Sequence, residues 1–319
     1  MEGTPIKIVV LDGAALNPGD LSWDWLNRFG QYTVYPRTDS EAEAVARIGS
    51  SEIVLTNKTP ITKALLRQCP AIRYIGVLAT GYNVVDVAAA RERNIPVTNV
   101  PSYGTNVVAQ YTMALLLEIC HQIGLHNQAV HHGAWAKSPV FSFWLTPQSE
   151  LAGKTIGIIG LGHIGTAVAK LASAFGMQVL AYTRTEKPGI QCVDLDTLLH
   201  RSDVISLHCP LLPETTEMIC EEAIAKMKDG AILLNTSRGG LMNEAAVAQA
   251  LETGKLSYAA VDVVSQEPIL AGNPLLSAPN CIITPHMAWA PVESRQRLMA
   301  CVEQNLAAFL RGRAQNVVN

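Results

Sequence analysis

The sequence predicts an α/β protein with two doubly wound parallel-sheet domains. Residues 155–182 contain an apolar run, a glycine-rich turn, a helical pattern and a second apolar run, which is the order of elements in a Rossmann fold. Residues 1–100 repeat a short apolar run followed by a more polar, helix-compatible segment, as expected of strands that alternate with helices. The length of 319 residues is sufficient for two domains that each bury a core.

In the first domain, strands are expected at four apolar runs, residues 6–11, 53–55, 74–78 and 96–98. Ligands of doubly wound sheets bind beyond the carboxyl ends of the strands. The loops at residues 56–58 and 79–83 are therefore candidates for ligand binding. Within the second loop, Thr80 and Gly81 are the candidate residues, and the alternative is that they only turn the chain.

The first domain is expected to end near residue 100. Residues 100–104 have the composition of a connector, and apolar residues then recur at helical spacing. At the other end of the chain, residues 292–310 place apolar side chains on one helical face. Because the second sheet is complete by then, this last helix is expected to return and cover the first domain.

The segment before the second domain carries several aromatic residues, Trp135, Phe141, Phe143 and Trp144. Aromatic side chains gathered in one segment tend to bury, here against a second subunit or within an intrachain core. The nearby histidines, at positions 121, 126, 131 and 132, have no acidic or cysteine partner at ligand spacing. We therefore expect surface or interface histidines and no metal site.

The glycine-rich turn at residues 160–165 predicts a dinucleotide site. Gly160 permits a tight turn, Gly162 lets the backbone approach a pyrophosphate, and Gly165 allows close packing of helix on strand. The phosphates would then meet the free N–H groups at the start of the helix, which include those of His163 and Ile164.

Polar groups also follow the later strands of the second domain, which are expected at residues 204–207, 231–234, 258–263 and 281–284. The carboxyl ends of parallel strands lie on one edge of the sheet, so these groups should collect there. Further cofactor contacts are expected at this edge, from Cys209, Pro210 and Thr236.

Three residues in loops after strands could carry chemistry, namely Arg238, Glu267 and His286. Each alone could be an ordinary surface group, but together they supply what reduction of a 2-oxo acid requires. Negative charge that builds on the carbonyl oxygen needs a proton donor and a fixed cation. A carboxylate bonded to one histidine nitrogen would orient the ring, and the planar fork of arginine suits a carboxylate next to a carbonyl.

Composition and charge exclude other classes of protein. Hydrophobic residues make up 49% of the chain, charged residues 16%, and the net charge is −3, so neither a nucleic-acid partner nor a disordered tail is expected. Apolar stretches fall far short of the ~20 residues that span a bilayer, and the N-terminal residues lack the basic region of a signal peptide. Seven cysteines without a CxxC pair favour reduced thiols in a cytoplasmic protein.

Four ordered motifs resemble those of the D-isomer-specific 2-hydroxyacid dehydrogenases, and the resemblance covers essentially the whole chain. They are GLGHIG at 160–165, NTSRGG at 235–240, Asp262 with QEP at 266–268, and PH at 285–286. The resemblance implies a Rossmann nucleotide domain, residues 101–289, inserted into a flavodoxin-like substrate domain, residues 1–100 and 290–319, with the cleft between them. It also implies a homodimer formed mainly through the nucleotide domain.

The same resemblance implies roles for single residues. Arg238 would bind and polarise the 2-oxo acid, His286 would be the acid and base, and Glu267 would hold His286. Asp262 would contact the nicotinamide carboxamide. Backbone N–H groups of Thr80 and Gly81 would bind the substrate carboxylate.

Within this family, Trp289, three residues after His286, and the aromatic segment at 141–147 look most like glycerate dehydrogenases and hydroxypyruvate or glyoxylate reductases. Trp289 would wall a pocket for a small substrate, and the alternative is a packing tryptophan at the hinge. Other substrates of the family, of the D-lactate or phosphoglycerate type, remain open. A nucleotide-sensing corepressor is a further alternative, disfavoured because no long polar tail or basic extension is present.

One position departs from the pattern of NAD-using members, in which an acidic residue about twenty residues after the glycines binds the ribose. Here Tyr182 is followed by Thr183, Arg184 and Thr185. Hydroxyl groups and a guanidinium could bind a 2′-phosphate that a carboxylate would repel. This segment therefore favours NADP. The alternative is a solvated loop that leaves NAD usable, and Glu186 could approach the ribose if the loop turns.

Overall fold

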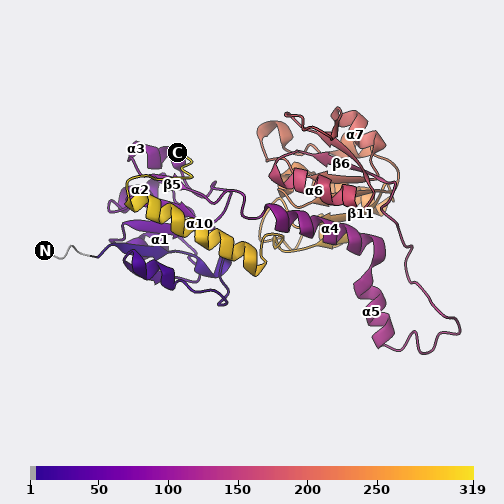
Figure 1. Cartoon of the computed structure of the whole chain (residues 1–319), viewed down its shortest axis with the longest axis horizontal. Coiled ribbons are helices and arrows are strands. Elements are labelled where there is room, and N and C mark those ends of the chain that lie inside the picture. Colours follow the sequence, from indigo (N-terminus) through magenta and orange to yellow (C-terminus); the bar gives the residue numbers. More distant parts are fainter. Residues whose placement is uncertain (1–4) are drawn as a thin grey trace. The chain divides into compact units, whose positions relative to one another are not determined.

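A computed structural model describes residues 5–319, and this part of the chain forms two compact units (Figure 1). The first unit comprises the residues up to Tyr103 together with Ala290–Asn319. The second unit is Gly104–Trp289. The first unit therefore takes residues from both ends of the chain.

A parallel sheet of five strands, in the order β2-β1-β3-β4-β5, forms the centre of the first unit. The strands are β1 (Lys7–Val10), β2 (Gln31–Val34), β3 (Ile53–Thr56), β4 (Tyr74–Val77) and β5 (Val97–Thr98). The α-helices are α1 (Glu41–Ile48), α2 (Lys63–Gln68), α3 (Val87–Glu92) and α10 (Val292–Leu310), with short 3-10 turns at Gly13–Ala15 and Asp24–Arg28.

Local sequence explains why these elements form. Strands β3 and β4 are buried at every position, which fits the apolar runs of a sheet covered on both faces. Three helices begin at a capping residue, Ser40, Thr62 or Asp86, whose side chain accepts a hydrogen bond from the N–H three residues later. Helix α10 packs on this sheet, where Phe309 stacks on Tyr74 with ring centroids 4.7 Å apart.

The second unit contains a parallel sheet of seven strands in the order β12-β11-β10-β9-β6-β7-β8. The strands are β6 (Thr155–Ile159), β7 (Gln178–Tyr182), β8 (Gln191–Cys192), β9 (Val204–Leu207), β10 (Ala231–Asn235), β11 (Leu256–Val261) and β12 (Cys281–Ile283). The α-helices are α4 (Thr105–His121), α5 (Ile123–His131), α6 (His163–Ala174), α7 (Leu195–Arg201), α8 (Glu221–Ala225) and α9 (Glu244–Glu252). Short 3-10 turns lie at Pro213–Thr215, Gly239–Leu241 and Pro274–Leu276.

The strand order of the second sheet positions its ligand site. The chain proceeds from β6 outward to β7 and β8 on one side, and then returns to β9 on the other side of β6. The loops after β6 and β9 therefore diverge, and such a switch point at the carboxyl ends of the strands is where doubly wound sheets bind ligands.

Helix α5 and the segment that follows it, residues 132–150, form an arm that extends away from this sheet (Figure 1). Helix α5 has no buried residue, in contrast to α4 immediately before it. We call residues 123–150 the arm. Within residues 5–319, the structure contains no helix that is long and apolar enough to cross a membrane.

Candidate active site

The glycine turn between β6 and α6 has the geometry of a phosphate site. Gly160 has φ of +98°, and a Cβ there would lie 2.7 Å from the backbone N of Cys209. A Cβ on Gly165 would lie 2.0 Å from the carbonyl oxygen of Gly160, whereas a Cβ on Gly162 would meet nothing within 4 Å. Two glycines are therefore required by close packing, and the third leaves open space.

The start of helix α6 offers donors into that space. Within the described chain, the backbone N–H groups of Gly162, His163 and Ile164 donate no hydrogen bond. Free N–H groups at the start of a helix, together with the positive end of its dipole, suit a pyrophosphate. The residues present thus fit the diphosphate of a dinucleotide.

At the end of β7, the segment predicted to recognise the ribose is exposed to solvent apart from Thr183, which is half-buried. Thr183 and Thr185 bond to each other, since the Thr183 hydroxyl accepts from the Thr185 N–H at 3.3 Å. No ion pair within residues 5–319 involves Arg184. Its guanidinium is therefore available to an anionic group.

The loop that carries Arg238 is shaped by the buried side chain of Asn235. The Asn235 amide donates to the carbonyl of Arg238 at 2.9 Å, and its oxygen accepts from the N–H of Ser237 at 3.0 Å. The Ser237 hydroxyl in turn donates to the carbonyl of Cys209 at 2.8 Å, and Thr236 bonds to Thr112 on α4 at 2.9 Å. Ser237 thus ties the loop after β10, which contains the predicted cofactor position Thr236, to Cys209, the predicted position after β9.

Arg238 itself is exposed, and its guanidinium donates to the carbonyl of Ser237 at 2.7 Å. Its loop nevertheless lies against the loop that carries Glu267. A Cβ on Gly239 would lie 1.9 Å from the backbone carbon of Val264, so only glycine permits this approach.

Glu267 and His286 form the ion pair predicted for the site, with Glu267 Oε2 2.7 Å from His286 Nδ1. The other carboxylate oxygen of Glu267 accepts from the N–H of Val264 at 3.3 Å. The side chains of His286 and Glu267 are 31% and 33% exposed, so a ligand can reach them. No residue in the described part of the chain bonds to His286 Nε2, which leaves that nitrogen to a substrate.

The loop that carries His286 is held from beneath by Asp262, which is 1% exposed. Its carboxylate accepts from the Thr284 hydroxyl at 2.6 Å and from the N–H groups of Met287 and Ala288 at 2.9 and 2.8 Å. His286 has φ of +53°, a left-handed conformation that costs a residue with a Cβ free energy. The bonds to Asp262 therefore fix a backbone that His286 would not adopt unaided.

Trp289 closes the same loop, since its indole N–H donates to the carbonyl of His286 at 2.8 Å. Sequence reasoning assigned Trp289 to the wall of the substrate pocket and Asp262 to the nicotinamide, and both contacts stay predictions. It missed that the two side chains hold the His286 loop. A polar residue directly after a buried apolar strand was the available signal for Asp262.

In the first unit, the two predicted substrate residues lie in the loop after β4. The Thr80 hydroxyl donates to the carbonyl of Val100 at 2.8 Å. Among the described residues, the backbone N–H groups of 79–83 donate no hydrogen bond. This loop therefore presents a row of unused donors at the carboxyl edge of its sheet.

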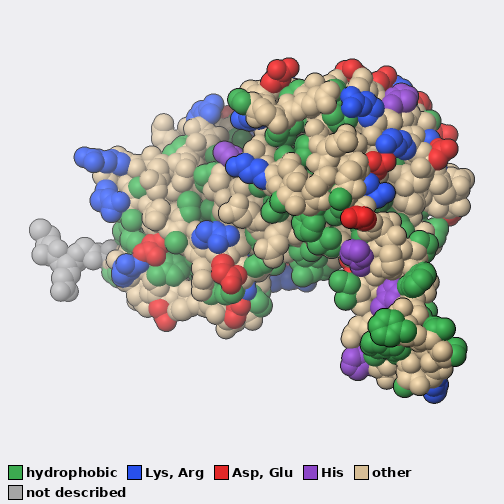
Figure 2. All heavy atoms as spheres, turned by 45° about the vertical axis from the view of Figure 1, so that its right-hand side comes forward, with side chains coloured by type: hydrophobic (Ala, Val, Ile, Leu, Met, Phe, Trp, Pro, Cys, Tyr) green, Lys and Arg blue, Asp and Glu red, His purple; other side chains and the backbone are tan. Residues whose placement is uncertain are grey.

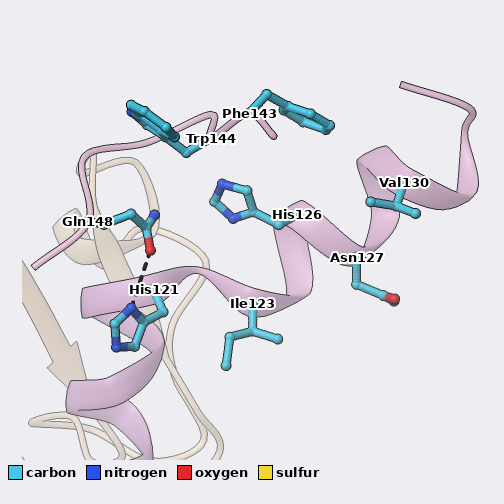
Figure 3. Close-up of a pocket in the computed structure, with 8 residues that line it drawn as sticks. All are labelled: His121, Ile123, His126, Asn127, Val130, Phe143, Trp144 and Gln148. Atoms are coloured by element: carbon cyan, nitrogen blue, oxygen red, sulfur yellow. Dashed lines mark hydrogen bonds between the residues drawn. The ribbon is translucent and has the colours of Figure 1, made fainter. Parts of the chain in front are cut away.

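The arm carries the exposed aromatic side chains. Phe141 is 92% exposed and Trp144 68%, so the intrachain-core alternative is wrong for these two residues. Hydrophobic side chains cover the end of the arm (Figure 2). Figure 3 shows a hollow between helix α5 and the returning segment, where His126 accepts from the N–H of Leu145 at 2.9 Å.

Residues 5–319 contain no group of three or more histidine, cysteine or acidic residues that could hold a metal ion. The four histidines of α4, α5 and the arm, at positions 121, 126, 131 and 132, bond instead to nearby backbone and side chains. His121 Nδ1 lies 3.2 Å from the Gln148 side-chain oxygen, and the other three bond to the carbonyl four residues earlier.

The geometry defines a class of protein, a Rossmann-type oxidoreductase with a paired histidine and glutamate beside a dinucleotide site. Residues 113–288 match the family model described as the D-isomer specific 2-hydroxyacid dehydrogenase, NAD binding domain. The chain belongs to the D-isomer-specific 2-hydroxyacid dehydrogenase family.

Known relatives extend this similarity over nearly the whole chain. A hydroxypyruvate reductase of Blautia hydrogenotrophica is 56% identical, with 98% of this chain and 100% of that protein covered. A glycerate dehydrogenase of Methylorubrum extorquens is 43% identical, with 98% of each covered. Among solved structures, an acyclic imino acid reductase in complex with NADPH and D-Arg has a TM-score of 0.86 at 31% identity, covering 98% of this chain and 100% of that one. The protein is therefore a nicotinamide-dependent oxidoreductase acting on CH–OH donors.

Proposed function

We propose that the protein reduces hydroxypyruvate or glyoxylate to D-glycerate or glycolate. The observation that carries this proposal is the 2.7 Å pair of His286 Nδ1 and Glu267 Oε2 at the dinucleotide edge, which leaves Nε2 without a bond to any residue of 5–319. The names of the relatives, a hydroxypyruvate reductase and a glycerate dehydrogenase, support the choice of substrate.

The chain's own residues account for the proton and the charge. A bound nicotinamide supplies hydride to the carbonyl carbon. Protonated His286 donates a proton from Nε2 to the carbonyl oxygen as that oxygen becomes an alkoxide. Glu267 accepts from Nδ1–H, which fixes the tautomer and stabilises the charged ring. In the oxidative direction, the same neutral nitrogen takes the proton back.

Substrate binding requires partners for a carboxylate. Arg238 presents a planar guanidinium that can bind two oxygens at once. In the first unit, the backbone N–H groups of Thr80 and Gly81 are further proposed partners for a substrate carboxylate. Trp289 would limit the pocket to small acids.

NADP is the proposed cofactor. The absence of an acidic residue at Thr183 and Thr185, and the unpaired guanidinium of Arg184, support a site for the 2′-phosphate. Arg184→Ala should raise the KM for NADPH by about tenfold, since a charge-assisted bond is lost, and leave the KM for NADH nearly unchanged. An equal change for both cofactors would contradict this assignment.

We also propose that the protein is a homodimer that forms through the second unit. Its proposed location is the cytoplasm, where thiols stay reduced. Apolar side chains on the arm, including Ile123, Phe141 and Trp144, are 63%, 92% and 68% exposed, which is typical of a covered interface. Phe141→Glu with Trp144→Glu should shift the mass in light scattering from dimer to monomer. Lys137→Glu, at an exposed polar position of the same arm, is the control.

The function is tested by initial rates with hydroxypyruvate, glyoxylate, pyruvate and phosphohydroxypyruvate, each with NADPH and with NADH. The proposal expects fast turnover of the first two acids and a preference for NADPH. Preference for pyruvate or phosphohydroxypyruvate would overturn the choice of substrate, and inactivity on all four would overturn the reductase assignment.

A further inference from the structure

A buried carboxylate in the first unit has no role in the proposed chemistry. Asp12 follows strand β1 and is 5% exposed. Its oxygens accept from the backbone N–H groups of Asn57, Lys58 and Thr59 at 2.7, 2.5 and 2.7 Å. The Thr59 hydroxyl adds a fourth bond at 3.1 Å. A buried charge with this many donors is fully satisfied, so the loop after β3 is fixed around it.

This fixed loop supports the next one. The side-chain amide of Asn57 donates to the carbonyl of Leu78 at 2.8 Å, in a buried hydrogen bond. Leu78 is the residue immediately before the loop 79–83. That loop is bonded on its other side to the connector at 99–100, where the Asn99 amide donates to the carbonyl of Thr80 at 2.7 Å and Thr80 to the carbonyl of Val100 at 2.8 Å.

The two loops orient their backbone donors in opposite ways. The N–H groups of 57–59 all point inward to Asp12 and are unavailable to a ligand. Those of 79–83 have no acceptor within the described chain. Asp12 therefore binds no ligand itself, yet the loop with the free donors is built on the one that Asp12 holds.

We propose that Asp12 is a positioning residue for the substrate carboxylate, acting through the 57–59 loop and Asn57 on the donors of the loop 79–83. This inference rests on the proposed function in one respect, because it takes the ligand of those donors to be the carboxylate of a 2-oxo acid. Hydrogen bonds to an anion depend on the direction of each N–H, and small displacements of a binding loop weaken them strongly.

The direction of the change in KM when Asp12 loses its charge distinguishes a positioning role from a purely electrostatic one. If Asp12 acted only through its negative charge, removing that charge would strengthen the binding of an anion. If it positions the loop, Asp12→Asn weakens binding, because an amide of the same shape places an N–H₂ group against backbone donors. The two readings thus predict opposite changes in KM.

The test compares Asp12→Asn with Ser202→Ala in the full-length protein. Ser202 is buried in the second unit, and its hydroxyl donates to the carbonyl of Leu198 at 2.6 Å before strand β9, at the amino end of that sheet. Both changes remove a buried hydrogen bond, so both are expected to lower the melting temperature. Asp12→Asn should raise the KM for hydroxypyruvate by about tenfold and change kcat by less than about twofold, whereas Ser202→Ala should change neither.

Binding of oxalate in the presence of NADP⁺, measured by calorimetry, provides a readout without turnover, because oxalate has the adjacent carboxylate geometry of a 2-oxo acid. Its Kd should also rise by about tenfold in Asp12→Asn, with the Kd for NADPH unchanged. Unchanged or tighter binding of oxalate would overturn the positioning role. If the wild-type protein bound oxalate but turned over none of the four acids, the proposed function would fail while this contrast still decided the inference.

Asn57→Ala covers the case in which Asp12→Asn does not fold. It leaves the carboxylate and its backbone bonds intact and removes only the amide bond to Leu78. The same weakening of oxalate, about threefold to tenfold, is expected. Wild-type affinity in Asn57→Ala would break the connection between the two loops and overturn the proposal.

Discussion

At the carboxyl edge of each of the two sheets, a buried aspartate accepts hydrogen bonds from a neighbouring loop, but the two loops present different groups. Asp12 follows β1 in the first unit and Asp262 follows β11 in the second, and they are 5% and 1% exposed. Each carboxylate accepts bonds from the N–H groups of consecutive residues in a neighbouring loop, and each also accepts from a threonine hydroxyl, of Thr59 or of Thr284.

The difference lies in what each held loop presents outward. The loop held by Asp262 carries His286, a titratable side chain fixed at positive φ. The loop held by Asp12 carries no such group in the proposed chemistry, and the next loop presents backbone N–H groups. Under the proposed function, the two sheets would serve different purposes, proton transfer and anion binding, through the different atoms that the same kind of support orients.

Replacing His286 should have the largest effect on kcat, because His286 is the proposed proton donor at the carboxyl edge of the second sheet. His286→Ala should lower kcat by about 10²- to 10⁴-fold, the usual contribution of a general acid. Binding of NADPH, followed by its fluorescence, should stay near the wild-type affinity. A kcat near that of the wild type in His286→Ala would show that His286 is not the proton donor.

The next effect compares the two supports directly. Asp262→Asn should lower kcat by about 10- to 100-fold, because one acceptor oxygen is replaced by an N–H₂ group that faces a donor of the His286 loop. Asp12→Asn, by contrast, should act on KM. Thr284→Val removes a single donor to Asp262 without touching its carboxylate, and should show a smaller fall in kcat at unchanged NADPH affinity. If Asp262→Asn changed the affinity for NADPH and left kcat unchanged, the bonds between Asp262 and the His286 loop would not contribute to catalysis.

Local features of this fold could be predicted from sequence. The two parallel-sheet units were confirmed, since their central strands are short apolar runs separated by helix-compatible segments. Two edge strands, Gln31–Val34 and Gln191–Cys192, were missed. Both are partly exposed, so neither needs a continuous apolar run. Gln31–Val34 alternates polar and apolar residues over only four positions, and Gln191–Cys192 has two residues, which is too short for a periodic signal.

The supports of the site could not be predicted, because their partners are distant along the chain. Asp12 bonds to residues 45 to 47 positions away, and Asp262 to residues 22 to 26 positions away. Periodicity reports which face of an element is buried, but it gives no pairing between loops. The pairing of Glu267 with His286 was predicted from the chemistry of a 2-oxo acid reduction and from the resemblance to a family, and not from periodicity.

Another strand of the second unit, β9, is followed by a half-buried titratable group, His208. Burial lowers the pKa of His208, after β9, from the ordinary 6.5 to about 4. Between these values the unfolded chain binds the proton and the folded chain does not, so stability falls as the pH falls from about 6.5 to 4. At pH 5 the loss should be about 1–2 kcal/mol.

Urea unfolding at pH 7.5 and pH 5 measures this loss. His208→Gln retains a polar partner for Ser206, which bonds to the ring at 2.8 Å, and removes the titration. Its stability should therefore depend less on pH than that of the wild type. Equal sensitivity to acid in both proteins would exclude His208 as the cause.

The smallest effect concerns Trp289, and it decides between the support and the pocket wall. Trp289→Phe keeps an aromatic ring but loses the indole N–H that donates to the carbonyl of His286 at 2.8 Å. Since one neutral hydrogen bond contributes about 1 kcal/mol, kcat should fall by about fivefold at nearly constant KM if Trp289 only holds the loop. A rise in the KM for hydroxypyruvate with unchanged kcat would instead make Trp289 part of the pocket. Trp289 would then act on substrate binding, as proposed for the loop 79–83. Asp262 and Glu267 would remain as the residues that hold the His286 loop.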